Sequence, residues 1–156
     1  MTWGVIQYRF GDRSGLLSAA IAHGFRSFRT AIRSVSVPDG TLRQCVEAVV
    51  EAAWSAFSSA ESRASLEILI SARAGRERAR IGELENMARD MRELSTVLVG
   101  GGDHSGYPDA FVGEVLWATL RGLVMAQMLT SRPIDSSGER ALLVDLITRL
   151  LEGAAA

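Results

Sequence analysis

Residues 12–33 read DRSGLLSAAIAHGFRSFRTAIR and set the fold class of the chain. Asp12 stands where the N-cap of a helix is needed, and no glycine-proline pair interrupts the stretch that follows it. We therefore predict one long helix that continues to about Arg33. Its apolar side chains recur at the three- and four-residue spacing of a single helix face, namely Leu17, Ile21, Phe25, Phe28 and Ile32.

Helical patterns also fill the sequence on both sides of this stretch. A short helix is expected before the turn at Gly11, and the segments Thr41–Gln44, Ser58–Glu61 and Ser136–Glu139 have the spacing of capping boxes. No run alternates between apolar and polar residues as a strand would, so the sequence predicts an all-α antiparallel bundle. The expected helices cover about residues 2–8, 12–33, 41–57, 58–74, 76–99, 108–129 and 136–152.

Composition narrows the class of protein. The 156 residues include a single cysteine, Cys45, which excludes an internal disulfide framework and fits a reducing cytoplasm. All 17 basic residues are arginines, so chemistry that needs lysine is excluded. Residues 1–33 carry five arginines against one acid (+4), and the remainder carries 12 against 17 (−5), which indicates that a polyanion would meet the N-terminal end. No segment is apolar enough to predict a signal peptide or membrane span.

The two last predicted helices are apolar on more than one side. A helix of this kind must bury both sides, and a bundle of 156 residues has limited interior. We therefore expect a homodimer in which each subunit contributes this helix pair to a four-helix interface, the alternative being a monomer that buries both helices in its own core. The predicted interface residues are Leu116, Leu120, Leu123, Leu143, Leu146, Ile147 and Leu150.

The sequence gives little support to a catalytic site or to a metal-binding site. The two histidines, His23 and His104, are far apart in sequence and have no cysteine pair beside them, so we predict no metal site and no cofactor. Asp103 and His104 lie in a glycine-rich stretch that offers a catalytic pair no rigid support. No nucleophile and base are close together in sequence, and we expect that the protein is not an enzyme.

The first residues carry a resemblance to a known family. Residues 2–17 resemble the end of the helix-turn-helix region of TetR/AcrR transcriptional regulators, whose pattern joins an aromatic-rich triplet ending in Phe to a short turn, a basic residue and Leu-Leu. Beyond these residues the chain matches that family only in character. The matching positions are Thr2, Gly4, Val5, Ile6, Tyr8, Phe10, Arg13, Leu16 and Leu17.

The resemblance implies a ligand-responsive DNA-binding regulator, usually a repressor. Residues 1–33 would be the remnant of a DNA-binding domain, and residues 34–156 an effector-binding and dimerisation domain of the TetR C-terminal type. Thr2, Trp3 and Gln7 would face operator DNA, while Tyr8 and Arg13 would contact phosphates, as hydroxyl and guanidinium donors do.

The same resemblance implies a cavity for a small, apolar effector inside the helical body. Large, adaptable side chains could line it, although each of them could equally be ordinary core. The predicted lining residues are Trp54, Phe57, Met87, Met91, Trp117 and Met125.

One departure from the family pattern affects DNA binding. The family places two further helices before the residues matched by Thr2 onward, and we expect this chain to lack them and to bind operator DNA weakly or not at all. The alternative function is a helical homodimeric interaction or scaffold protein without a DNA role.

Overall fold

The computed structural model describes residues 3–71, 89, 92–93, 109–132 and 134–153. Every regular element within these residues is a helix, which confirms the all-α prediction. The predicted helix at 76–99 lies outside the described residues except for Arg89, Arg92 and Glu93, which are helical. The described helices are α1 (Trp3–Phe10), α2 (Arg13–Arg33), α3 (Leu42–Ser58), α4 (Ala60–Ser71), α6 (Asp109–Met128) and α7 (Ser137–Glu152).

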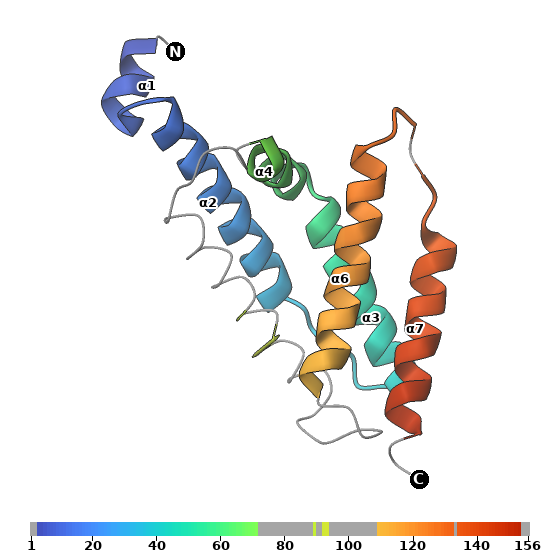
Figure 1. Ribbon diagram of the computed structural model, residues 1–156. Helices are drawn as coiled ribbons and strands as arrows, with labels where there is room; N and C mark the ends of the chain where they lie inside the picture. The colour runs from blue at the N-terminus through green and yellow to red at the C-terminus, as the bar shows by residue number, and fades with distance from the viewer. Residues whose placement is uncertain (1–2, 72–88, 90–91, 94–108, 133, 154–156) are drawn as a thin grey trace.

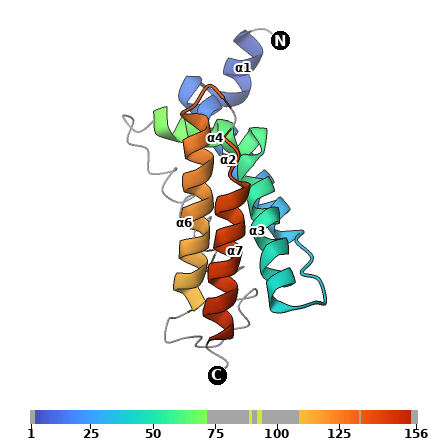
Figure 2. The ribbon, with the colours of Figure 1, turned by 90° about the vertical axis from the view of Figure 1, so that its right-hand side faces the viewer.

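The helices form an elongated bundle with α1 at one end (Figure 1). Helix α2 leads from α1 along the bundle and packs against α4 and α3. Helices α6 and α7 run antiparallel beside each other and pack against α3 (Figures 1 and 2). The C-terminal end of α7 therefore lies at the opposite end of the molecule from α1.

The predicted starts of the two central helices are confirmed. Asp12 caps α2, where its side chain accepts a hydrogen bond of 2.8 Å from the Gly15 amide. The turn before it uses Gly11 at a φ of 77°, a conformation that costs glycine little. Thr41 and Gln44 form the predicted reciprocal capping box of α3.

The two other predicted capping boxes differ from the structure. Ser59, and not Ser58, accepts the Ser62 amide at the start of α4, because the Ser58 hydroxyl instead donates to the Trp54 carbonyl of the preceding turn. Helix α7 does begin after Ser136, but the Ser136 hydroxyl makes no capping bond. It accepts a hydrogen bond of 3.0 Å from the Arg140 guanidinium, which lies one turn further along.

The core is aliphatic around one aromatic row. The Phe57 ring lies 4.6 Å from Phe28 and 6.0 Å from Trp117, measured between ring centroids, so the row joins α2, α3 and α6. The predicted inward face of α2 is confirmed for Ile21, Phe25, Phe28 and Ile32, which are all buried, whereas Leu17, nearest the start of the helix, is only partly buried. Burial of these rings and aliphatic side chains provides most of the driving force for the bundle.

Candidate functional site

Helix α1 presents a polar surface at the end of the bundle. Tyr8 is 95% exposed, and Gln7, Arg9 and Arg13 are exposed beside it in sequence. Of the other residues for which a DNA contact was predicted, Trp3 is the first residue of α1, and Thr2 lies outside the described residues. The structure thus brings Gln7, Tyr8 and Arg13 to one projecting end (Figure 1).

The apolar side of α1 is only partly covered. Val5 is half exposed, while Phe10 is partly buried at the turn and has the Arg9 guanidinium 5.8 Å from its ring centroid. Phe10 therefore lies partly shielded at the turn where α1 meets α2. An eight-residue helix gains little from its own hydrogen bonds, so α1 depends on its packing against α2.

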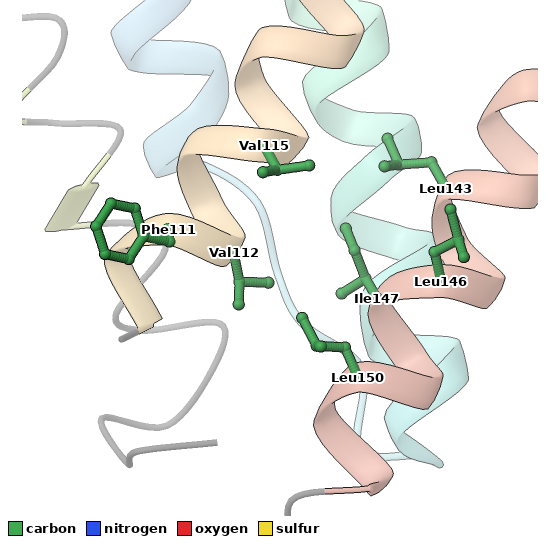
Figure 3. Close-up of a pocket in the computed structure, with 7 residues that line it drawn as sticks. All are labelled: Phe111, Val112, Val115, Leu143, Leu146, Ile147 and Leu150. Atoms are coloured by element: carbon green, nitrogen blue, oxygen red, sulfur yellow. The ribbon is translucent and has the colours of Figure 1, made fainter. Parts of the chain in front are cut away.

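A groove with apolar walls separates α6 from α7. It has a volume of about 310 Å³, and its seven lining residues are all hydrophobic (Figure 3). Side chains from the two helices point toward one another across it. The lining residues of this α6–α7 groove are Phe111, Val112, Val115, Leu143, Leu146, Ile147 and Leu150.

Large apolar side chains also stand exposed around the groove. Phe111, Val115, Leu142 and Leu146 are between 55% and 59% exposed, and we call these four residues the α6–α7 face. A cluster of exposed aliphatic and aromatic groups of this kind is typical of an interaction surface. These four side chains carry no hydrogen-bonding group, so an apolar partner surface would cover them at the lowest cost.

The predicted interface residues divide between this surface and the interior. Leu116 and Leu120 are buried in the core of the subunit, so the structure does not offer them to a partner. Leu143 and Ile147 are also buried but line the floor of the α6–α7 groove, and Leu146 is exposed on its rim. Leu123 and Leu150 are partly buried.

Sequence reasoning missed Phe111, Val115 and Leu142 as surface residues. The signal was present, because both helices have apolar residues around most of their circumference. Helical periodicity does not state which of several apolar sides meets the rest of the subunit.

The four predicted effector-binding residues that the structure describes lie in different surroundings. Phe57 and Trp117 belong to the buried aromatic row, whereas Met125 is exposed on α6. Trp54 is partly buried against α7. Met87 and Met91 lie outside the described residues.

Trp54 is part of a contact between α3 and α7 that the sequence did not indicate. The Arg140 guanidinium carbon lies 4.6 Å from the Trp54 ring centroid, and the Arg140 Nε donates to a Glu51 carboxylate oxygen at 2.8 Å. A second ion pair, between Arg43 and Asp145, joins the same two helices nearer the start of α3. These contacts fix how α7 lies along α3.

Asp135 lies just before the start of α7 and interacts with its first residue, Ser137. A hydrogen bond from the Ser137 amide to Asp135, 2.9 Å long, and a second from the Ser137 side chain hold the pKa of the Asp135 carboxyl below its ordinary value. Asp135, and not the predicted Ser136, thus satisfies an amide at the first turn of α7.

Two features are absent from the described part of the chain, namely a metal-binding cluster and a membrane-spanning helix. No three histidine, cysteine or acidic side chains there are grouped so that they could hold a metal ion. Within the same residues, no helix combines the length and apolar character needed to cross a bilayer.

The comparisons with known proteins identify no relative, so a function has to be proposed from the geometry of the described residues. No model of a protein family matches the chain, and no curated protein or solved structure matches it either.

Proposed function

We propose that the chain is the effector-binding and dimerisation body of a ligand-responsive transcriptional regulator of the TetR type. The observation that carries this proposal is the position of α1. This short helix stands at the end of α2, outside the helical body, and exposes Gln7 and Tyr8 to solvent, while Arg13 is exposed at the adjoining start of α2. A helix that reads DNA needs such a projecting position in order to reach a groove.

The chemistry of this end suits a nucleic acid backbone. Tyrosine hydroxyl and arginine guanidinium groups donate hydrogen bonds to phosphate oxygens, and such contacts position a protein on DNA. Residues 1–33 have a net charge of +4 while the rest of the chain has −5. These residues form α1 and α2, and Arg9 and Arg13 lie at the end that carries α1, so a duplex would be attracted to this part of the molecule.

The α6–α7 face supports the second half of the proposal, which is that two copies associate. In a two-fold dimer the same face of each subunit covers the other, so the apolar surface of one subunit meets the identical, self-complementary apolar surface of its partner. Side chains of the partner would fill the α6–α7 groove. An obligate interface of this type buries on the order of 2,000 Å² or more.

The alternative function is a homodimeric interaction or scaffold protein without a DNA role. The exposed α6–α7 face favours it as much as it favours a regulator, because both would use this face for association. The two functions differ in what they require of Tyr8 and Arg13.

DNA binding by residues 1–156 tests the proposal. We expect weak binding to a mixed-sequence duplex in fluorescence anisotropy at about 50 mM salt, with affinity that falls as salt rises. Arg13→Ala and Tyr8→Ala should each weaken binding several-fold, and Arg13→Ala should lower the salt slope by about 1. Arg149→Ala is the matched control, because this exposed arginine lies in the last turn of α7, at the other end of the molecule. Affinity and salt slope that do not respond to Arg13→Ala or Tyr8→Ala would leave the scaffold function in place of the regulator.

A further inference from the structure

A second cavity lies between α2 and α3, on another side of α3 from α7. It has a volume of about 390 Å³, which is within the range of small-molecule sites. Its space results from small side chains, since Ala31 of α2 faces Ala52 and Ala56 of α3 across it. The buried Phe28, whose ring packs on Phe57, supplies an aromatic wall.

Four serines give this α2–α3 cavity its polar groups. The Ser34 hydroxyl donates to the Ala31 carbonyl at 2.8 Å, which leaves its oxygen able to accept a hydrogen bond from a ligand. The hydroxyls of Ser27 and Ser55 make no hydrogen bond with any other residue that the structure describes, so each can both donate and accept.

The fourth serine connects the cavity to the interior. The Ser59 hydroxyl donates to the Ser62 hydroxyl at 3.0 Å, and the buried Ser62 donates in turn to the Ala56 carbonyl at 2.7 Å. The proton of Ser59 is thereby committed. One lone pair of its oxygen accepts the Ser62 amide, and the second is left for a ligand in the cavity that Ser59 lines. This chain of hydrogen bonds fixes the Ser59 hydroxyl in one orientation.

We propose that the α2–α3 cavity binds a small neutral molecule that combines an apolar ring with hydrogen-bond donors, such as an aromatic amide or a phenol. The ring fits against Phe28 and the alanines, and the donors match the oxygens of Ser34 and Ser59. None of the lining residues is charged. The cavity is open to solvent on the side of Ala31, Ser34 and Ser55, which are exposed, so a charged ligand would lose part of its hydration. It would gain no counter-ion from the lining residues, and that cost favours a neutral ligand.

Occupancy of the cavity would act on α2, the helix that carries α1. A molecule held between α2 and α3 fixes the separation of the two helices along the last two turns of α2. Only this consequence for α1 rests on the proposed function, because the binding site itself needs no DNA.

Titration of the ¹⁵N-labelled chain with benzamide, followed by NMR, tests the site directly. We expect saturable shifts confined to amides of residues 27–35 and 52–59, with a Kd on the order of 1 mM for so small a probe. Benzoate, which has nearly the same shape but a negative charge, should bind at least about tenfold more weakly.

Two variants make the test specific. Ala31→Leu places a larger side chain in the cavity from an exposed position and should weaken benzamide binding at least about tenfold, while Ala20→Leu, also exposed on α2 but outside the cavity, should leave it unchanged. Ser55→Ala removes a hydroxyl without adding bulk to the cavity and should weaken binding a few-fold. Equal binding of benzoate, shifts centred on the α6–α7 groove, or full affinity in Ala31→Leu would each overturn the proposal. The assay contains no DNA, so its outcome is separate from that of the anisotropy experiment.

Discussion

Gly24 of α2 lies so close to Ser65 of α4 that a β-carbon on residue 24 would stand 1.8 Å from the Ser65 hydroxyl oxygen. The same β-carbon would be 2.8 Å from the Glu61 carbonyl oxygen and 2.9 Å from the Ser65 β-carbon. The hydroxyl can rotate away, but the carbonyl oxygen belongs to the backbone of α4. The absence of a side chain at Gly24 therefore sets how closely α2 and α4 approach each other.

Gly24→Ala should consequently destabilise the protein, although alanine is the better helix former. The two helices would have to move apart, and we expect a loss of about 1–3 kcal/mol in the free energy of unfolding, measured by urea denaturation. Gly138→Ala in α7 is the matched control, because a β-carbon there meets nothing within 4 Å. Equal stability of Gly24→Ala and the wild type would show that this close approach does not constrain the fold.

Arg140 should contribute to stability through its contact with Trp54 as well as through its ion pair with Glu51. The Arg140 side chain is only 16% exposed, so its guanidinium is partly shielded from water. We expect Arg140→Ala to cost about 1–2 kcal/mol. A double-mutant cycle of Arg140→Met and Trp54→Leu should give a coupling free energy of about 0.5–1 kcal/mol.

The exposed Arg149 on the same helix serves as the control for Arg140. Arg149→Ala should change the free energy of unfolding by less than about 0.5 kcal/mol. If the cycle gives no coupling, the stacking of Arg140 on Trp54 does not stabilise the packing of α7 on α3.

Leu146→Glu should prevent association of the two copies. Leu146 is 57% exposed at the rim of the α6–α7 groove, and a carboxylate there would be buried against apolar side chains in a dimer. We expect a monomer in sedimentation equilibrium at concentrations where the wild type is dimeric. Ile70→Glu is the matched control, since Ile70 of α4 is similarly exposed but outside the α6–α7 face. A wild type that remains monomeric at about 100 μM would contradict the proposed interface, because obligate dimers persist well below that concentration.

Asp135→Asn should have an effect that depends on pH. Hydrogen bonds from Ser137 lower the pKa of Asp135 in the folded protein, so the carboxylate stabilises the fold above the ordinary aspartate pKa. That contribution is lost as the pH falls through the lowered pKa. The urea midpoint of Asp135→Asn should therefore lie below that of the wild type at pH 7, and the difference should shrink by about pH 3.

Asp39→Asn provides the comparison for Asp135, because Asp39 is an exposed aspartate in the segment before α3. We expect this variant to differ from the wild type by less than about 0.5 kcal/mol at neutral pH. A difference between Asp135→Asn and the wild type that is constant with pH would indicate that the charge of Asp135 has no role at the start of α7.

Much of the fold was predictable because its signals are local. The helix face formed by Ile21, Phe25 and Phe28 and the capping box at Thr41 each depend on residues within a few turns of one another. The predicted cap of α4 was wrong because a neighbouring backbone carbonyl competed for the hydroxyl of the expected capping residue. The Ser58 hydroxyl bonded back to the Trp54 carbonyl, and Ser59 took its capping position.

The candidate sites were less predictable. The resemblance to TetR/AcrR regulators implied that Tyr8 and Arg13 face outward, and both residues are exposed. Leu116 and Leu146 looked equivalent in sequence, yet the first is buried in the subunit and the second is exposed on it. The cavity between α2 and α3 had no sequence signal, because serine and alanine are common on any helix surface.

The amino-acid sequence alone determined that the chain is helical, where α2 and α3 begin, and which face of α2 points inward. These properties depend on hydrogen bonds and spacings within single segments, which a linear pattern records. Only the tertiary structure decided which apolar side of α6 and α7 stays outside, that Arg140 meets Trp54, and that Gly24 touches Ser65. Each of these depends on how whole helices rotate and approach one another, and the relative free energies of such arrangements come from packing between residues distant in sequence.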